Sequence, residues 1–244
     1  MDRGLYIAAS GMLAELTRQD QIANDLANSS TPGYKSDRSV QQSFGDLLLA
    51  NSSTGQPIGS LGLGTAIVAE RTDLSQAPLR ETGQPLDLAL EGEGFFAVQT
   101  TAGTRYTRDG QFQLDGAGRL VNQSDLPVLD SNGKPITIGN AAKDVTIGPD
   151  GTITAGGRAI ARLNVVSLTA PVKEGDTLFS GIPGAVPATT AVRQGSVEGS
   201  GVNPARAMVD MLVSFRAYEA QQRVVHAIDE TLQKGISAGG PGSG

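Results

Sequence analysis

The chain has 244 residues, 39% of them hydrophobic, which is enough for one large domain or two small ones. Its 19 basic and 25 acidic residues give a formal net charge of -6, with no run of lysine or arginine, so we do not expect nucleic acid as a partner. Without cysteine and with a single histidine it can form no disulfide, and neither a zinc site nor another cofactor is expected.

The first predicted element is an amphipathic helix within residues 5–28. Leu5, Met12 and Leu26 are spaced by seven and fourteen residues, with Gln19 interrupting them, and a neighbouring stripe is formed by Ala9, Leu16 and Ala23. The helix should stop at Thr31-Pro32-Gly33, since the residue before a proline avoids helical geometry. The segment 1–34 is therefore predicted to hold the first helix, without a cleaved secretory signal at its start.

Residues 35–64 are predicted to be an extended connector, because the part from Asn51 to Gly64 is rich in glycine and serine. From residue 65 to 180 short apolar alternations bounded by turn residues predict a mostly antiparallel β domain, a compact barrel or sandwich. Asp109-Gly110, Asn132-Gly133 and Asp150-Gly151 are expected to be type I′ hairpin turns. A return connector over 181–202 follows.

A second long helix is predicted over 203–236, beginning at Asn203-Pro204 and ending near Lys234-Gly235. Its heptad spacing is given by Met211, Tyr218, Val225 and Leu232, which are flanked by Met208, Leu212, Phe215 and Ile228. Residues 237–244 are expected to be a disordered tail. The predicted fold is α+β, with paired, coiled-coil-like terminal helices enclosing an inserted all-β domain, although periodicity alone equally allows an ordinary helical hairpin packed on a core.

Catalytic candidates are few. His226 lies in the second helix without a recognisable nucleophile partner, and Glu91 and Glu93 lie beside glycines that indicate a solvated turn. Residues 130–133 resemble part of a calcium loop, but Val128 occupies the first ligand position and Gly139 the twelfth, where a glutamate is needed. We therefore expect neither an enzyme nor a metal site, and no apolar stretch is long enough to cross a membrane.

Three stretches resemble the flagellar basal-body rod and hook family in chain order. They read GLYIAASGMLAELTRQDQIANDLANSSTPGYK, then TGQPLDLALEGEGFFAVQ followed by RYTRDGQFQLDGAGRLV, and finally GSVEGSGVNPARAMVDMLVSFRAYEAQQRVVHAIDETLQK. Within the family they resemble the proximal-rod and distal-rod proteins more than the much longer hook protein. The sequences of residues 96–100 and 105–108 slightly favour the proximal type.

The resemblance implies a structural subunit of the bacterial flagellar basal body, in the periplasmic or cell-wall space, that is exported by the flagellar type III apparatus. It implies a hollow helical polymer that transmits torque, with the terminal helices inside and with other rod and hook proteins as partners. Assembly residues are then expected on the helices: Leu5, Met12, Leu16, Leu26, Asn28, Met208, Met211, Phe215, Tyr218, Val225 and Leu232.

Two other functions fit the sequence less well. A secreted polysaccharide-binding or cell-wall-acting β protein would use Glu91, Glu93 and the adjacent Phe95 and Phe96, but the chain has no tryptophan and only 4% aromatic residues. A coiled-coil scaffold unrelated to motility would form a stable oligomer through its isolated termini.

Overall fold

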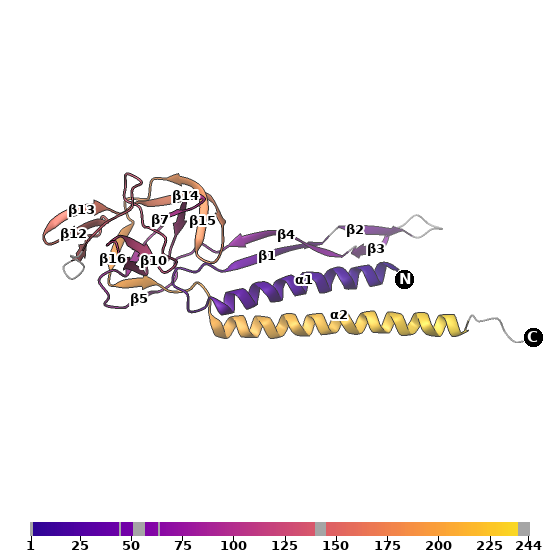
Figure 1. The fold of residues 1–244 in the computed structure, drawn as a ribbon. Helices are drawn as coiled ribbons and strands as arrows, with labels where there is room; N and C mark the ends of the chain where they lie inside the picture. Colours follow the sequence, from indigo (N-terminus) through magenta and orange to yellow (C-terminus); the bar gives the residue numbers. More distant parts are fainter. Residues whose placement is uncertain (1, 44, 51–56, 63, 140–144, 239–244) are drawn as a thin grey trace, which may run out of the picture. The chain divides into compact units, whose positions relative to one another are not determined.

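The computed structural model describes residues 2–43, 45–50, 57–62, 64–139 and 145–238 (Figure 1). The chain forms two compact units, each built from segments that are distant in sequence. Unit 1 comprises Met1–Ala27, Asp37–Arg71 and Pro204–Gly244, and unit 2 comprises Asn28–Ser36 and Thr72–Asn203. Two terminal helices and a mostly antiparallel β body between them confirm the predicted α+β class.

Unit 1 contains both helices, α1 (Asp2–Ala27) and α2 (Pro204–Ala238). The start of α2 directly after Asn203 agrees with its predicted N-terminal proline. At the other end α2 continues through Gly235, and α1 ends before the predicted stop, because Thr31 already closes a turn by donating its backbone N–H to the Asn28 carbonyl. The predicted tail falls largely on residues 239–244, which lie outside the described residues.

The two helices of unit 1 run antiparallel, side by side (Figure 1). Glycines bring them close together: a Cβ added to Gly4 would lie 3.3 Å from Ile228 Cδ1, and one added to Gly11 would lie 2.7 Å from Gln221 Nε2. Glu15 and Ser214 are buried where the helices meet. At Gly4 and Gly11 a longer side chain of α2 therefore faces a glycine of α1, whereas at Glu15 the longer side chain belongs to α1.

The rest of unit 1 is a pair of β ladders in the segment that we predicted as an extended connector and just beyond it. β1 (Asp37–Ser43) pairs with β4 (Thr65–Thr72), and β2 (Asp46–Ala50) pairs with β3 (Pro57–Gly62). In the second ladder the strands are antiparallel, with Leu48 opposite Ser60. Most of the predicted linker from Asn51 to Gly64 thus belongs to a strand or to residues outside the described ones.

Unit 2 is a β body in which every described strand pairing is antiparallel. Four of its strands close a barrel in the order β14-β15-β8-β7. The strands are β5 (Leu79–Glu81), β6 (Leu88–Glu91), β7 (Phe95–Thr100), β8 (Gly103–Thr107), β9 (Phe112–Leu114), β10 (Leu120–Asn122), β11 (Val145–Ile147), β12 (Thr152–Ala155), β13 (Arg158–Arg162), β14 (Val165–Lys173), β15 (Leu178–Gly184), β16 (Ala191–Gln194) and β17 (Ser196–Glu198).

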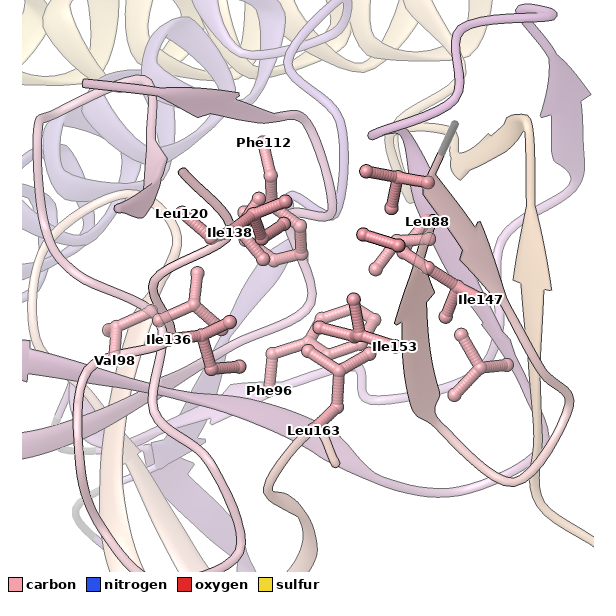
Figure 2. Packing of buried hydrophobic residues seen from close by; sticks show 14 of the residues in the cluster. Leu88, Phe96, Val98, Phe112, Leu120, Ile136, Ile138, Ile147, Ile153 and Leu163 are labelled. Carbon is pink, nitrogen blue, oxygen red and sulfur yellow. The ribbon is translucent and has the colours of Figure 1, made fainter. Parts of the chain in front are cut away.

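Consecutive phenylalanines on β7 supply two separate cores, because neighbouring side chains of a strand point to opposite faces. Phe96 packs edge-to-face on Phe112 at 5.3 Å between ring centroids, in the larger cluster shown in Figure 2. Phe95 packs on Phe179 at 5.2 Å, in the smaller cluster. The strand thus joins both apolar clusters of unit 2.

The three predicted type I′ turns are wrong. That turn needs a positive φ at both central residues, but Asn132 and Asp150 do not have one, and neither residue of Asp109-Gly110 does. At all three turns an aspartate stabilises another geometry. Asp130 Oδ1 accepts the backbone N–H groups of Asn132 and Lys134, and Asp109 and Asp150 each accept the N–H of the residue two positions further on.

Candidate assembly surface

The helices of unit 1 expose many large apolar side chains. On α1 the most exposed are Tyr6 and Leu13, at 61% and 66%, and on α2 Met208 and Val209 are about as open, at 59% and 60%. Several such side chains close together mark an interaction surface, whereas single exposed apolar residues are ordinary. Among the described side chains of the helices the set comprises Leu5, Tyr6, Leu13, Leu16, Met208, Val209, Leu212, Val213, Phe215 and Val224.

The first turns of α2 expose apolar side chains on both flanks of the side that packs on α1. Ala207 and Ser214 are buried and Met211 is partly buried, on the side that includes the contact with Glu15 of α1. One flank of that side exposes Met208, Leu212 and Phe215, and the opposite flank exposes Val209 and Val213. Arg206, Asp210 and Arg216 supply the charged part of the same turns, but two exposed apolar flanks on one helix indicate further neighbours, and the described part of unit 1 provides α2 with only one helix.

The structure divides the predicted assembly residues into three groups. Exposed side chains are those of Leu5, Leu16, Met208 and Phe215. Partly buried side chains of unit 1 are those of Met12, Leu26, Met211, Tyr218, Val225 and Leu232. Asn28 is partly buried and belongs to unit 2.

Sequence reasoning missed the residues by which α1 approaches α2. They are Gly4, Gly11 and Glu15, which precede or lie between the apolar stripes that the periodicity identified. A search for apolar side chains cannot find such positions. The seven-residue spacing of Gly4 and Gly11 is the signal that indicates a close approach of two helices.

A hollow of about 360 Å³ lies between α1 and β4 in unit 1. Its lining carries no charged side chain, and at its edge Ser10 Oγ accepts the backbone N–H of Thr65 at 3.4 Å. Tyr6 and Leu13 belong both to this lining and to the exposed apolar set. The apolar surface of α1 is therefore concave where it meets the strand, and its lining is formed by Tyr6, Ala9, Ser10, Leu13, Ala14, Thr17, Thr65 and Ile67.

Three glutamine side chains of the helices have a buried amide atom with no hydrogen-bond partner among the described residues. These atoms are Gln19 Nε2, Gln21 Nε2 and Gln221 Oε1. A buried polar atom without a partner costs about 1–3 kcal/mol. The helix pair thus has buried polar atoms without hydrogen-bond partners as well as exposed apolar side chains.

Little in the described residues indicates a catalytic or metal site. They contain no group of three or more histidine, cysteine, aspartate or glutamate side chains placed to hold a metal ion, and His226 is exposed on α2. Hydrogen bonds from the backbone N–H groups of Lys134 and Asn132 lower the pKa of Asp130, which caps its turn. None of the described helices combines the length and the apolar character needed to cross a membrane.

The residues suggested for a sugar site are not arranged as one. Phe95 and Phe96 are buried in the two cores, so neither ring can form an exposed platform for a sugar. The Glu91 carboxylate lies 3.1 Å from Arg193 Nη1 on the surface, in an ion pair that also involves Glu81. A β unit and a second unit with apolar, incompletely covered helices are instead the features of a structural subunit.

Comparison with known proteins agrees with this class. Residues 5–35 match the description "Flagella basal body rod protein", residues 89–155 match "Flagellar hook protein FlgE/F/G D1 domain", and residues 193–238 match "Flagellar basal body rod FlgEFG protein C-terminal". The matches fall in both helices and in the β body.

Relatives that match nearly the whole chain are also flagellar rod proteins. The chain is 32% identical to the flagellar basal-body rod protein FlgF of Caulobacter vibrioides, over 98% of this chain and 97% of the relative. It is 31% identical to FlgG of Bacillus subtilis, over 96% and 98%, and 33% identical to FlgF of Escherichia coli, over 94% and 95%. The chain belongs to the family of flagellar basal-body rod proteins, which are structural components of the bacterial flagellum.

Proposed function

We propose that α1 and α2 form a coiled-coil-like pair whose remaining apolar surface is buried against neighbouring copies of the chain in a helical, hollow rod. The observation that carries this proposal is the pair of exposed apolar flanks on α2. Contacts between identical subunits that do not close on themselves generate a helical filament. The partly buried residues Met211, Tyr218, Val225 and Leu232 would hold the pair, while Leu5, Leu16, Met208 and Phe215 would contact neighbours.

The rest of the function follows from membership of the rod family. The subunit would be exported by the flagellar type III apparatus, meet other rod and hook proteins at the ends of its own segment, and transmit torque without catalysing a reaction. Relatives with FlgF and FlgG names match at nearly equal identity. The assignment to the proximal type therefore stays a prediction that rests on the sequences of residues 96–100 and 105–108.

A charge placed on the exposed apolar surface tests the proposal. Phe215→Asp and Leu16→Asp alter side chains that are 50% and 41% exposed, so each variant should keep the helix content and the thermal unfolding of the purified wild-type chain. Neither should restore swimming, or rods in isolated basal bodies, to a strain that lacks the protein. Burying a charge against a neighbour would cost several kcal/mol at each contact.

Gln222→Asp is the matched control, since Gln222 is an exposed polar residue on the same helix, and it should swim normally. Swimming by Phe215→Asp and Leu16→Asp at the wild-type rate would show that this surface does not contact neighbouring subunits.

A further inference from the structure

Unit 2 contains a buried carboxylate that binds two cations. Glu198 Oε1 lies 2.5 Å from Lys35 Nζ, and Glu198 Oε2 lies 3.1 Å from Arg108 Nη1. Their side chains are almost inaccessible, with 1% exposure for Glu198, 0% for Lys35 and 4% for Arg108. We name Lys35, Arg108 and Glu198 the carboxylate clamp.

The clamp joins three parts of unit 2 that are far apart in sequence. Lys35 belongs to Asn28–Ser36, the segment that follows α1 in the chain. Glu198 ends β17, five residues before Asn203, where the chain enters α2. Arg108 directly follows β8 of the barrel, and its guanidinium lies over the Phe95 ring at 5.2 Å.

Backbone hydrogen bonds run in parallel with the ion pairs. Gly33 donates its N–H to the Glu198 carbonyl at 2.9 Å, and Gly201 donates its N–H to the Tyr34 carbonyl at 2.9 Å. The segment before α2 is also bound to the body, since Gly199 donates to the Pro78 carbonyl at 2.9 Å. The two segments are thus bound to each other and to the body.

Three hydrogen bonds of the clamp side chains complete the attachment. Lys35 Nζ also donates to the Ser75 carbonyl at 2.6 Å, and Ala77 donates its backbone N–H to Glu198 Oε1 at 2.8 Å. Arg108 Nη2 donates to the Gly92 carbonyl at 2.9 Å. Each clamp side chain therefore has at least one partner outside the clamp, which fixes its position.

One carboxylate serves both cations, so the attachments depend on one another. Burial lowers the pKa of Lys35 and that of Arg108, and the neighbouring Glu198 opposes the change in both. If either segment left, a buried charge would lose a partner, which is far more costly than breaking an exposed ion pair.

We propose that the carboxylate clamp couples the segment that follows α1 to the segment that precedes α2, so that both leave the β body together and not one at a time. These segments are the chain connections between unit 2 and the two helices. In a rod, a consequence that rests on the proposed function, a load on either helix would be carried by both connections.

Amide hydrogen exchange of the purified full-length chain tests the coupling, because exchange reports local opening. The informative amides are those of Gly33, Gly199 and Gly201. Lys35→Met removes a cation from the segment that follows α1. The Gly199 N–H donates to the Pro78 carbonyl and not to that segment, so its exchange reports on the segment that precedes α2. Coupling predicts that Lys35→Met accelerates exchange at all three amides at least about tenfold, and that Arg108→Met does the same, Gly33 included.

Arg105→Met is the matched control, since Arg105 pairs with Glu174 near the surface of the same unit. It should leave the three amides within about twofold of the wild-type rates. If Lys35→Met accelerates Gly33 while Gly199 keeps its wild-type rate, the segments are attached independently and the proposal is wrong.

Glu198→Gln provides a second test should a methionine variant fail to fold, because glutamine keeps the shape and one acceptor oxygen but removes the shared charge. It should accelerate all three amides together, and acceleration of one alone would contradict the clamp. Neither experiment requires a polymer, so its outcome is independent of the swimming test of Phe215→Asp.

Discussion

Ser214 Oγ donates a hydrogen bond of 2.6 Å to Glu15 Oε2, and both residues are buried between α1 and α2. The same hydroxyl lies 3.3 Å from the Glu15 carbonyl. A serine thus compensates a carboxylate that would otherwise be buried without a side-chain donor. This contact fixes the register of the helix pair at one point, whereas apolar side chains can slide past one another.

Replacing Ser214 by alanine should therefore weaken the helix pair. The Glu15 carboxylate would lose its donor, and we expect a loss of about 1–3 kcal/mol from the free energy of unfolding. Urea unfolding followed by far-UV circular dichroism measures it. Ser237→Ala, at an exposed serine of the same helix, should change the free energy by less than about 0.5 kcal/mol, and equal values for the two variants would contradict the compensation.

Phe96 should be among the most sensitive core positions of unit 2. It is fully buried, and Phe96→Ala removes its edge-to-face contact with Phe112 and leaves a cavity, with an expected cost of about 3–5 kcal/mol. Ile182→Ala, at a 70% exposed position of β15, should cost less than about 1 kcal/mol. Denaturant unfolding of both variants provides the comparison, and a small loss for Phe96→Ala would show that the cluster collapses around the gap.

The sequence predicted the two helices and the antiparallel β body because those depend on local periodicity. Seven-residue spacing and Asn203-Pro204 mark α2 without knowledge of its neighbours. Other features depend on long-range contacts. No local pattern indicates that Gly33 donates to the Glu198 carbonyl, so the sequence predicts residues 28–34 as part of the first helix segment although they belong to unit 2.

The candidate surface was predictable to a similar extent. Apolar spacing identified Met208 and Phe215, which the structure leaves exposed, but not Gly11 or Ser214, because residues that let helices approach carry little or no apolar side chain. The predictions of the type I′ turns were wrong for a different reason. The carboxylates of Asp130 and Asp150 accept backbone N–H groups that select another geometry, and a rule based on the types of the two central residues takes no account of these hydrogen bonds.

Gly33 should not tolerate a side chain. Its φ is +68°, and a Cβ would lie 2.3 Å from the backbone carbon of Arg108, which cannot move aside as a flexible side chain could. Gly33→Ala should lose more than about 3 kcal/mol or fail to fold. The control is Gly83→Ala, where φ is +70° and nothing lies within 4 Å of the added Cβ, so only the backbone strain of about 1 kcal/mol remains.

Thermal unfolding of the two variants separates strain from crowding. A much lower midpoint for Gly33→Ala than for Gly83→Ala is the expected result. Similar midpoints would mean that the segment 28–36 can shift away from Arg108, which would also weaken the case for the carboxylate clamp.

Asp109 should make the stability of unit 2 depend on pH. It is only 6% exposed, and burial raises its pKa to about 6, with a smaller contribution from the charge of Asp87, although the Gln111 backbone N–H acts in the opposite direction. Because the folded pKa lies above the unfolded value, the contribution to stability is complete below pH 4 and is lost as the pH rises through about 6. At pH 7.5 the loss is about 3 kcal/mol.

Asp109→Asn removes the charge and keeps an oxygen that can accept the Gln111 N–H. The variant should therefore be more stable than the wild type at pH 7.5, by up to about 3 kcal/mol, and its stability should change less between pH 4 and pH 7. Denaturant midpoints across this range measure the effect. Asp176→Asn, at an exposed aspartate, should follow the wild-type curve, and an Asp109→Asn curve that also follows it would show that Asp109 is solvated when it ionises.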